Sequence, residues 1–129
     1  MAASITQHSD FLKHKANLYQ GHIVRVCLAS ILLSPNTLPE EVLAAELTNY
    51  TRVVTHFYNG AGTYNAANNT LTFPAIVATF TALAQPLEWQ SVFVLVGDKV
   101  AAIIREIPPI ELLPGQSYTY RITLRELLS

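Results

Sequence analysis

Apolar and polar residues alternate in three runs along the last third of the chain. The runs cover residues 88–96, 99–107 and 117–124, and short Gly-Asp, Pro-Pro and Pro-Gly turns interrupt them. A period of two, bounded by such turn residues, is typical of antiparallel β-strands. The C-terminal third therefore predicts an antiparallel sheet.

The earlier part of the chain adds further strands and one helical patch. Residues 21–33 predict a long, mostly buried strand, and residues 50–58, 70–73 and 75–83 predict three more. Between them, Thr37 as a cap, Pro39 and two acidic residues open a short helix over residues 39–47. No strand–helix–strand alternation occurs, so we expect an all-β antiparallel β-sandwich of the jelly-roll or Ig-like type, with seven or eight strands.

At 129 residues the chain is expected to form one domain. Residues 1–20 differ in composition from the rest and are interpreted as an N-terminal arm, followed by the sandwich domain over residues 21–129. The arm is expected to dock on a neighbouring subunit or along its own sandwich, and a frayed terminus is the alternative. Even spacing within the strands predicts a core of Val24, Val26, Leu28, Val92, Val94, Ile103, Ile122 and Leu124.

The composition limits the classes of function. Only 13% of residues are charged, against about 25% in average domains. Such a surface indicates coverage by other subunits, so a homo-oligomer is expected. The net charge of −1 offers no footprint for nucleic acid, and no apolar run is long enough for membrane insertion. The N-terminus does not resemble a signal peptide, and the single cysteine fits synthesis in a reducing cytoplasm.

Residues with catalytic or metal-binding chemistry are few and poorly spaced. His8, His14 and His22 lie six and eight residues apart, which puts no pair of ligands on one helical face. Cys27 stands between Val26 and Leu28 in an apolar strand and is interpreted as a buried structural thiol. We therefore expect no enzyme activity, no cofactor and no metal.

Aromatic residues are better placed for recognition than the titratable ones. Such rings bury area at low entropic cost, so they suit a carbohydrate-binding or protein-contact surface. Cross-strand pairs and the rim of the core are the alternative interpretation of the same rings. The rings in question are Tyr50, Tyr58, Tyr64, Trp89, Tyr118 and Tyr120.

One motif resembles a known family. Residues 46–53 read Glu-Leu-Thr-Asn-Tyr-Thr-Arg-Val, which resembles the E-L-x-x-Y-x-R signature of small structural proteins of tailed bacteriophages. The resemblance continues through Gly-Thr-Tyr-Asn at 62–65, Phe-Pro at 73–74, the strand around Trp89 and the late Pro-Gly turn. It covers roughly residues 22–125.

The resemblance implies a non-enzymatic virion protein of the tail, fibre or baseplate, or an adaptor between them. A head decoration (cement) protein and a carbohydrate-binding β-sandwich module are the alternatives. Partners would be other virion proteins and copies of the chain itself, with a trimer favoured by analogy to fibre and decoration proteins. The expected interface residues are Phe11, Leu12, Leu18, Tyr19, Tyr50, Tyr58 and Tyr64.

Overall fold

The computed structural model of the chain describes residues 23–56, 62–97 and 99–127. The expected arm and the interface residues Phe11, Leu12, Leu18, Tyr19 and Tyr58 lie outside these ranges. The elements are β1 (Ile23–Ala29), α2 (Pro39–Ala44), β2 (Val53–His56), β3 (Thr63–Asn65), β4 (Thr70–Thr72), β5 (Ile76–Thr81), β6 (Leu87–Val96), β7 (Lys99–Leu112), β8 (Ser117–Ile122) and β9 (Arg125–Leu127).

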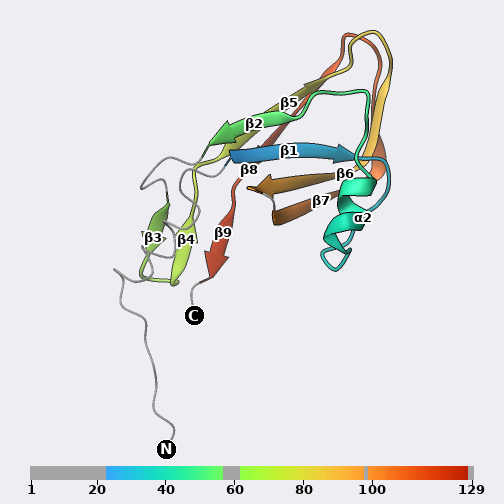
Figure 1. The fold of residues 1–129 in the computed structure, drawn as a ribbon. Coiled ribbons are helices and arrows are strands. Elements are labelled where there is room, and N and C mark those ends of the chain that lie inside the picture. The colour runs from blue at the N-terminus through green and yellow to red at the C-terminus, as the bar shows by residue number, and fades with distance from the viewer. Residues whose placement is uncertain (1–22, 57–61, 98, 128–129) are drawn as a thin grey trace, which may run out of the picture.

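The strands form antiparallel sheets packed together, which confirms the predicted all-β, sandwich-like fold (Figure 1). The main sheet has the order β2-β1-β6-β7, and a two-stranded sheet, β5-β8, packs on one of its faces. A third sheet has the order β3-β4-β9. Along the chain, β3 follows β2, β4 precedes β5 and β9 follows β8. Every strand pair in the described part of the chain is antiparallel.

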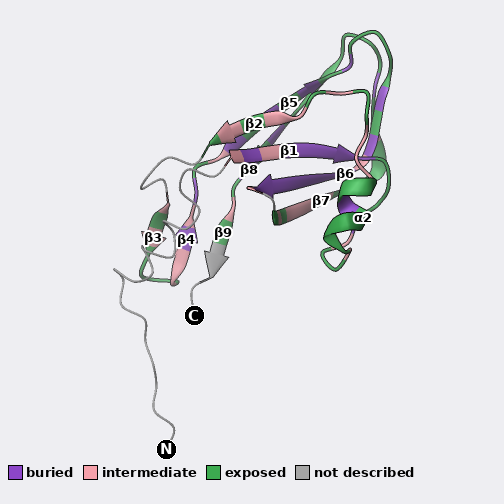
Figure 2. Cartoon of the chain, viewed as in Figure 1, coloured by how far each residue is buried: buried purple, intermediate pink, exposed green. Residues whose placement is uncertain are grey.

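The larger core lies between the main sheet and β5-β8. Even-numbered residues of β1 and of β6 from Val92 onward point into it, while Leu87 and Trp89 do so before the irregularity between Trp89 and Ser91. β5 alternates between buried and exposed residues (Figure 2). The predicted core residues Val24, Val26, Leu28, Val92, Val94 and Ile122 are all buried in this cluster, and Leu124 packs half-buried against it.

The main sheet is buried on its second face as well. Cys27 and Phe93 point to that face, where Leu33 and Val42 of the segment around α2 cover them. Because both faces are covered, residues 91–96 of β6 are buried without alternation. The prediction that Ile103 faces the core between the two sheets was wrong. Ile103 pairs with Phe93 and packs half-buried in this second cluster.

Several predicted boundaries also require correction. The first strand ends at Ala29, because the chain then turns away over the second face of the main sheet. The helix ends at Ala44, and Leu38 rather than Thr37 is its N-cap. The Thr37 hydroxyl instead accepts a hydrogen bond from the Ser34 amide at 2.9 Å, so it closes the preceding turn.

The last strands also differ from the prediction. The strand predicted to end before Pro108 continues as β7 through both prolines, with residues 106–109 bulging opposite Gln90. A second irregularity interrupts β7 near Ala101. The strand predicted over residues 117–124 ends at Ile122, and the separate strand β9 follows.

Candidate functional site

The densest polar cluster joins Glu46, Tyr50 and Arg52, three residues of the E-L-x-x-Y-x-R motif. The Arg52 guanidinium donates from Nε to Oε2 of Glu46 at 2.7 Å and from Nη2 to Oε1 at 2.5 Å. The Tyr50 hydroxyl also donates to Oε2 of the same carboxylate. This bidentate pair fixes the plane of the carboxylate, because the guanidinium fork matches both of its oxygens.

The cluster attaches the segment after α2 to the last residues of β1, which lie beyond the ladder between β1 and β2. Tyr50 precedes β2, and its hydroxyl accepts a hydrogen bond from the Leu28 amide at 2.9 Å. The Leu47 amide donates to the Leu28 carbonyl at 3.0 Å, and Glu46 forms an isolated β-bridge with Ala29. The motif therefore provides hydrogen-bond partners for the part of β1 that lies beyond its ladder with β2.

The charges in this cluster are set for structure rather than for proton transfer. Burial by itself would raise the pKa of Glu46, but the hydrogen bonds from Arg52 and Tyr50 outweigh it and lower that pKa. Burial and the hydrogen bond to Glu46 raise the pKa of Tyr50 well above its ordinary value. The carboxylate stays ionised and the phenol stays neutral at neutral pH, so neither group exchanges protons there.

Cys27 lies near this cluster, on the second face of the main sheet. Its side chain is fully buried, and burial raises the pKa of the thiol from 9.0 to about 11. A nucleophilic cysteine needs a lowered pKa and access to substrate. The structure thus places Cys27 where the sequence predicted a structural thiol.

A second polar chain crosses the main core. Trp89 Nε1 donates to the Tyr120 hydroxyl at 2.8 Å, and that hydroxyl donates to Oε1 of Glu106 at 3.0 Å. Trp89 is fully buried and Tyr120 is 8% exposed. Glu106 is the first residue of the bulge at residues 106–109. The carboxylate that accepts the hydrogen bond from Tyr120 therefore lies where β7 is irregular.

The aromatic residues expected at a recognition surface mostly belong to the core. Phe80 lies 6.0 Å from both Trp89 and Tyr50, measured between ring centroids. Tyr64 packs half-buried against the main core and donates to Oδ1 of Asn69 at 2.9 Å. Of the described aromatic residues in the expected set, Tyr118 has the largest exposure, at 36%. The structure therefore favours the core-rim interpretation for these rings.

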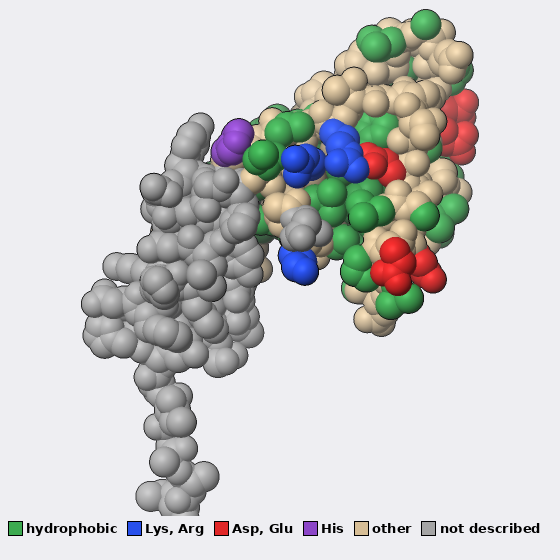
Figure 3. Space-filling model, viewed as in Figure 1, with side chains coloured by type: hydrophobic (Ala, Val, Ile, Leu, Met, Phe, Trp, Pro, Cys, Tyr) green, Lys and Arg blue, Asp and Glu red, His purple; other side chains and the backbone are tan. Residues whose placement is uncertain are grey.

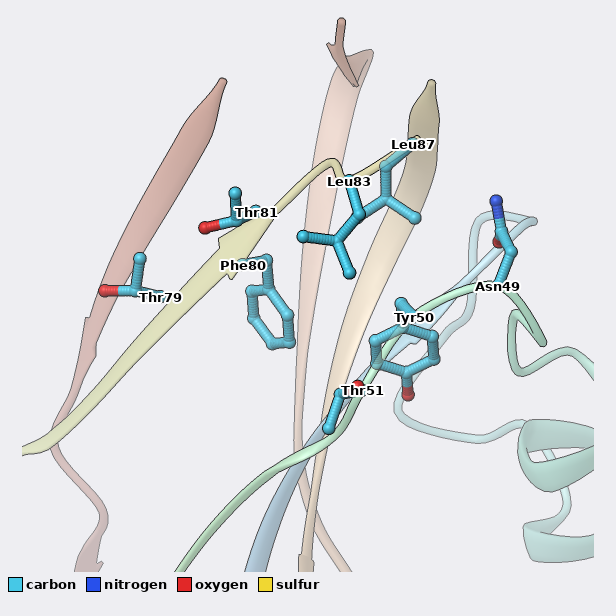
Figure 4. Close-up of a pocket in the computed structure, with 8 residues that line it drawn as sticks. All are labelled: Asn49, Tyr50, Thr51, Thr79, Phe80, Thr81, Leu83 and Leu87. Carbon is cyan, nitrogen blue, oxygen red and sulfur yellow. The ribbon is translucent and has the colours of Figure 1, made fainter. Parts of the chain in front are cut away.

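A pocket of about 230 Å³ lies between β5 and the segment that precedes β2 (Figure 4). Phe80, Leu83 and Tyr50 border this space, while Thr79 and Thr81 extend from the other side of β5. Asn49, Thr51 and Leu87 complete the lining. Its volume is below the roughly 300–1,000 Å³ of pockets that enclose whole small molecules, so it suits a single side chain or ring.

The outer face of β5-β8 carries a regular set of hydroxyl pairs. Thr79 and Thr119 are hydrogen-bonded through their hydroxyls at 2.8 Å, and Thr81 and Ser117 at 2.7 Å. Both pairs are exposed. Thr–Thr and Thr–Ser pairs of this kind stabilise antiparallel strands across the ladder.

Within residues 23–56, 62–97 and 99–127, no group of three potential metal ligands comes together. In the same ranges, no helix is long and apolar enough to cross a membrane. His56 is exposed on β2. Comparisons with protein-family models, with curated proteins and with solved structures found no match to this chain.

Two site residues were missed by reasoning from sequence. Ser91 is fully buried; its hydroxyl donates to the Ile31 carbonyl and accepts from the Leu33 amide, both at 2.8 Å. Glu106 was read only as part of an alternating strand. A polar residue among apolar neighbours in β6, and an acidic residue just before two prolines, were the available signals.

Proposed function

We propose that the protein is a non-enzymatic structural component of a tailed-bacteriophage virion, belonging to its tail, fibre or baseplate region. It acts by binding copies of itself and other virion proteins. The observation that carries the proposal is the amount of apolar surface on a small, sparsely charged sandwich. Large exposed apolar patches mark interaction sites in soluble proteins.

Several of the exposed apolar side chains lie in two stretches of the chain, and Val54, Val77 and Ile107 are exposed on β2, β5 and β7. The segment around α2 exposes Ile31, Leu32, Leu38 and Leu43 by 38–53%. At the end of the molecule that holds the β5–β6 and β7–β8 turns, Leu83 is 77% exposed and Leu113 is 55% exposed. Figure 3 shows hydrophobic side chains spread between small groups of charged ones on the face in view.

The polar clusters support a structural role for a second reason. The carboxylates of Glu46 and Glu106 both accept hydrogen bonds from neighbouring side chains within the fold. The E-L-x-x-Y-x-R motif that resembles phage structural proteins is itself one of these clusters. A motif whose side chains bond one another within the fold is consistent with a family of structural proteins rather than of enzymes.

The test is the composition of phage particles and the mass of the purified chain. Mass spectrometry of density-purified particles from the phage that encodes the chain is expected to detect it in stoichiometric amounts. Light scattering at micromolar concentration is expected to give a multiple of the 14.2 kDa chain mass, with a trimer as the number favoured by the resemblance. A monomer that is also absent from the particles would overturn the proposal.

A further inference from the structure

The pocket between β5 and residues 49–51 combines apolar and neutral polar walls (Figure 4). Phe80 and Leu87 are each 2% exposed, so they form its inner wall, whereas the exposed Leu83 forms part of its rim. None of the eight lining residues is Asp, Glu, Lys, Arg or His. The pocket therefore offers no ion pair to a charged ligand.

The wall that belongs to β5 presents backbone groups to the pocket. The Ala82 amide donates to the Gln116 carbonyl at 3.0 Å, which makes this a hydrogen-bonded pair of the ladder with β8. Such pairs alternate along antiparallel strands, so the even-numbered residues of β5 bond β8. The N–H and C=O groups of Thr79 and Thr81 point the other way, and both residues line the pocket.

The side chains of these two threonines are occupied on the outer face of the sheet. The Thr79 hydroxyl is hydrogen-bonded to that of Thr119, and the Thr81 hydroxyl to that of Ser117. Among residues 23–56, 62–97 and 99–127, no group is hydrogen-bonded to the outward backbone N–H and C=O of Thr79 and Thr81. Two amides and two carbonyls of β5 are thus free to bond a ligand.

The opposite wall is held in place by the fold. The Tyr50 hydroxyl accepts a hydrogen bond from the Leu28 amide and donates to the Glu46 carboxylate, which fixes the ring that borders the pocket. Asn49 Nδ2 donates to the Pro86 carbonyl at 3.4 Å, which ties this segment to the turn between β5 and β6. A preformed wall lowers the ordering cost of binding.

This wall also has hydrogen-bonding groups to spare. Within the described ranges, neither Oδ1 of Asn49 nor the hydroxyl of Thr51 has a hydrogen-bond partner, and both residues are exposed. Neutral donors and acceptors therefore border the pocket from two sides. A few polar groups around an apolar interior are what orient a small ligand in a binding site.

We propose that this pocket binds one neutral sugar ring of the pyranose class. A pyranose carries hydroxyl groups around its edge and C–H groups on its faces, which match the polar walls and the rings and leucines between them. A charged ligand would lose its hydration without meeting an opposite charge. A purely apolar ring would cover the backbone groups of Thr79 and Thr81 without bonding them, which is unfavourable.

The size of the pocket limits the ligand to a single ring. Its volume of about 230 Å³ corresponds to about eight waters at roughly 30 Å³ each. An oligosaccharide would extend beyond it past Leu83. A ligand of this size with few contacts is expected to bind with a dissociation constant in the millimolar range. The site does not depend on the proposed virion role.

The test is a titration of the ¹⁵N-labelled full chain, followed through its backbone amide signals by NMR. The sugars are the methyl pyranosides of glucose, galactose, mannose and N-acetylglucosamine, each up to about 50 mM. At least one is expected to shift the Thr79 and Thr81 amides in a saturable manner. The amides of Ala78 and Phe80, which bond β8, are expected to shift less.

Substitutions at Thr51 test the location of the site. Thr51→Tyr places a ring in the pocket and is expected to weaken binding at least about tenfold. Thr63→Tyr is the matched control, because Thr63 is exposed on β3 and does not line the pocket. Thr51→Val removes only the hydroxyl and is expected to weaken binding about two- to tenfold. A dispersed amide spectrum checks the fold of each variant.

Each outcome supports or overturns the proposal. Saturable shifts at Thr79 and Thr81 that are lost in Thr51→Tyr and kept in Thr63→Tyr support it. If Thr51→Tyr does not fold, Thr51→Val decides the location. The proposal is overturned if none of the four pyranosides gives a saturable shift, or if Thr51→Val binds as the native chain does. It is also overturned if cyclohexanol or glucuronate binds this site more tightly than every neutral pyranoside.

Discussion

Arg52 holds the carboxylate of Glu46 through two hydrogen bonds, from Nε at 2.7 Å and from Nη2 at 2.5 Å. The Glu46 side chain is 16% exposed and that of Arg52 36% exposed, so water screens the pair only in part. Tyr50 connects the carboxylate to the backbone of β1. The residues Glu46, Tyr50 and Arg52 therefore hold the segment before β2 against β1.

Tyr50→Phe is expected to destabilise the fold by about 1–3 kcal/mol, because the Leu28 amide and Glu46 both lose a partner. Urea unfolding followed by fluorescence measures the change. Tyr64→Phe is the control, since it removes one hydrogen bond to Asn69 and is expected to cost at most about 1.5 kcal/mol. Equal effects of the two variants would contradict a special role for Tyr50.

Acid is expected to weaken this contact. The pKa of Glu46 is lowered in the folded chain by Arg52 and Tyr50, despite the opposing effect of burial. A lowered folded-state pKa contributes stability that is present above the ordinary value of 4.5 and is lost as the pH falls through the folded-state value. Chemical denaturation at a series of acidic pH values should show this loss.

The matched variant for the acid experiment is Glu46→Gln, which keeps the shape of the side chain and removes its titration. It is expected to be less stable at neutral pH and to show a flatter dependence below pH 4.5. If the Glu46→Gln variant kept the acid profile of the native chain, that profile would belong to other carboxylates.

Trp89→Phe is expected to cost about 2–4 kcal/mol, because it leaves a cavity in the main core and removes the donor to Tyr120. Tyr118→Phe changes a partly exposed ring on β8, in the sheet that faces β6, and is expected to stay within about 0.5 kcal/mol. Thermal unfolding of both variants provides the comparison. A harmless Trp89→Phe would contradict the buried chain from Trp89 to Glu106.

The thiol of Cys27 is expected to resist modification in the folded protein. Its pKa of about 11 leaves little thiolate at pH 8, and the side chain is fully buried. A chromogenic disulfide reagent should react with it only at the rate of unfolding, and rapidly in denaturant. Fast labelling of the native chain would mean that the face covered by α2 opens readily.

The sequence by itself determined the class of fold and part of its core. Alternation in residues 88–96 and 117–124 predicted strands, because side chains in a strand point to opposite faces in turn. The same argument placed Val24, Val94 and Ile122 in the core, and the structure confirms it. Such patterns are local, so they can be read without knowing which strands are neighbours.

Tertiary structure alone decided which faces are covered and which polar groups meet. Ile103 belongs to the second cluster because the chain after β1 folds back over that face, which alternation within β7 does not reveal. Glu106 meets Tyr120 only through the bulge of β7 and the stacking of the two sheets. That β5 forms its ladder with β8 among the described strands likewise depends on strand order, since a strand's sequence does not state which strands are its neighbours.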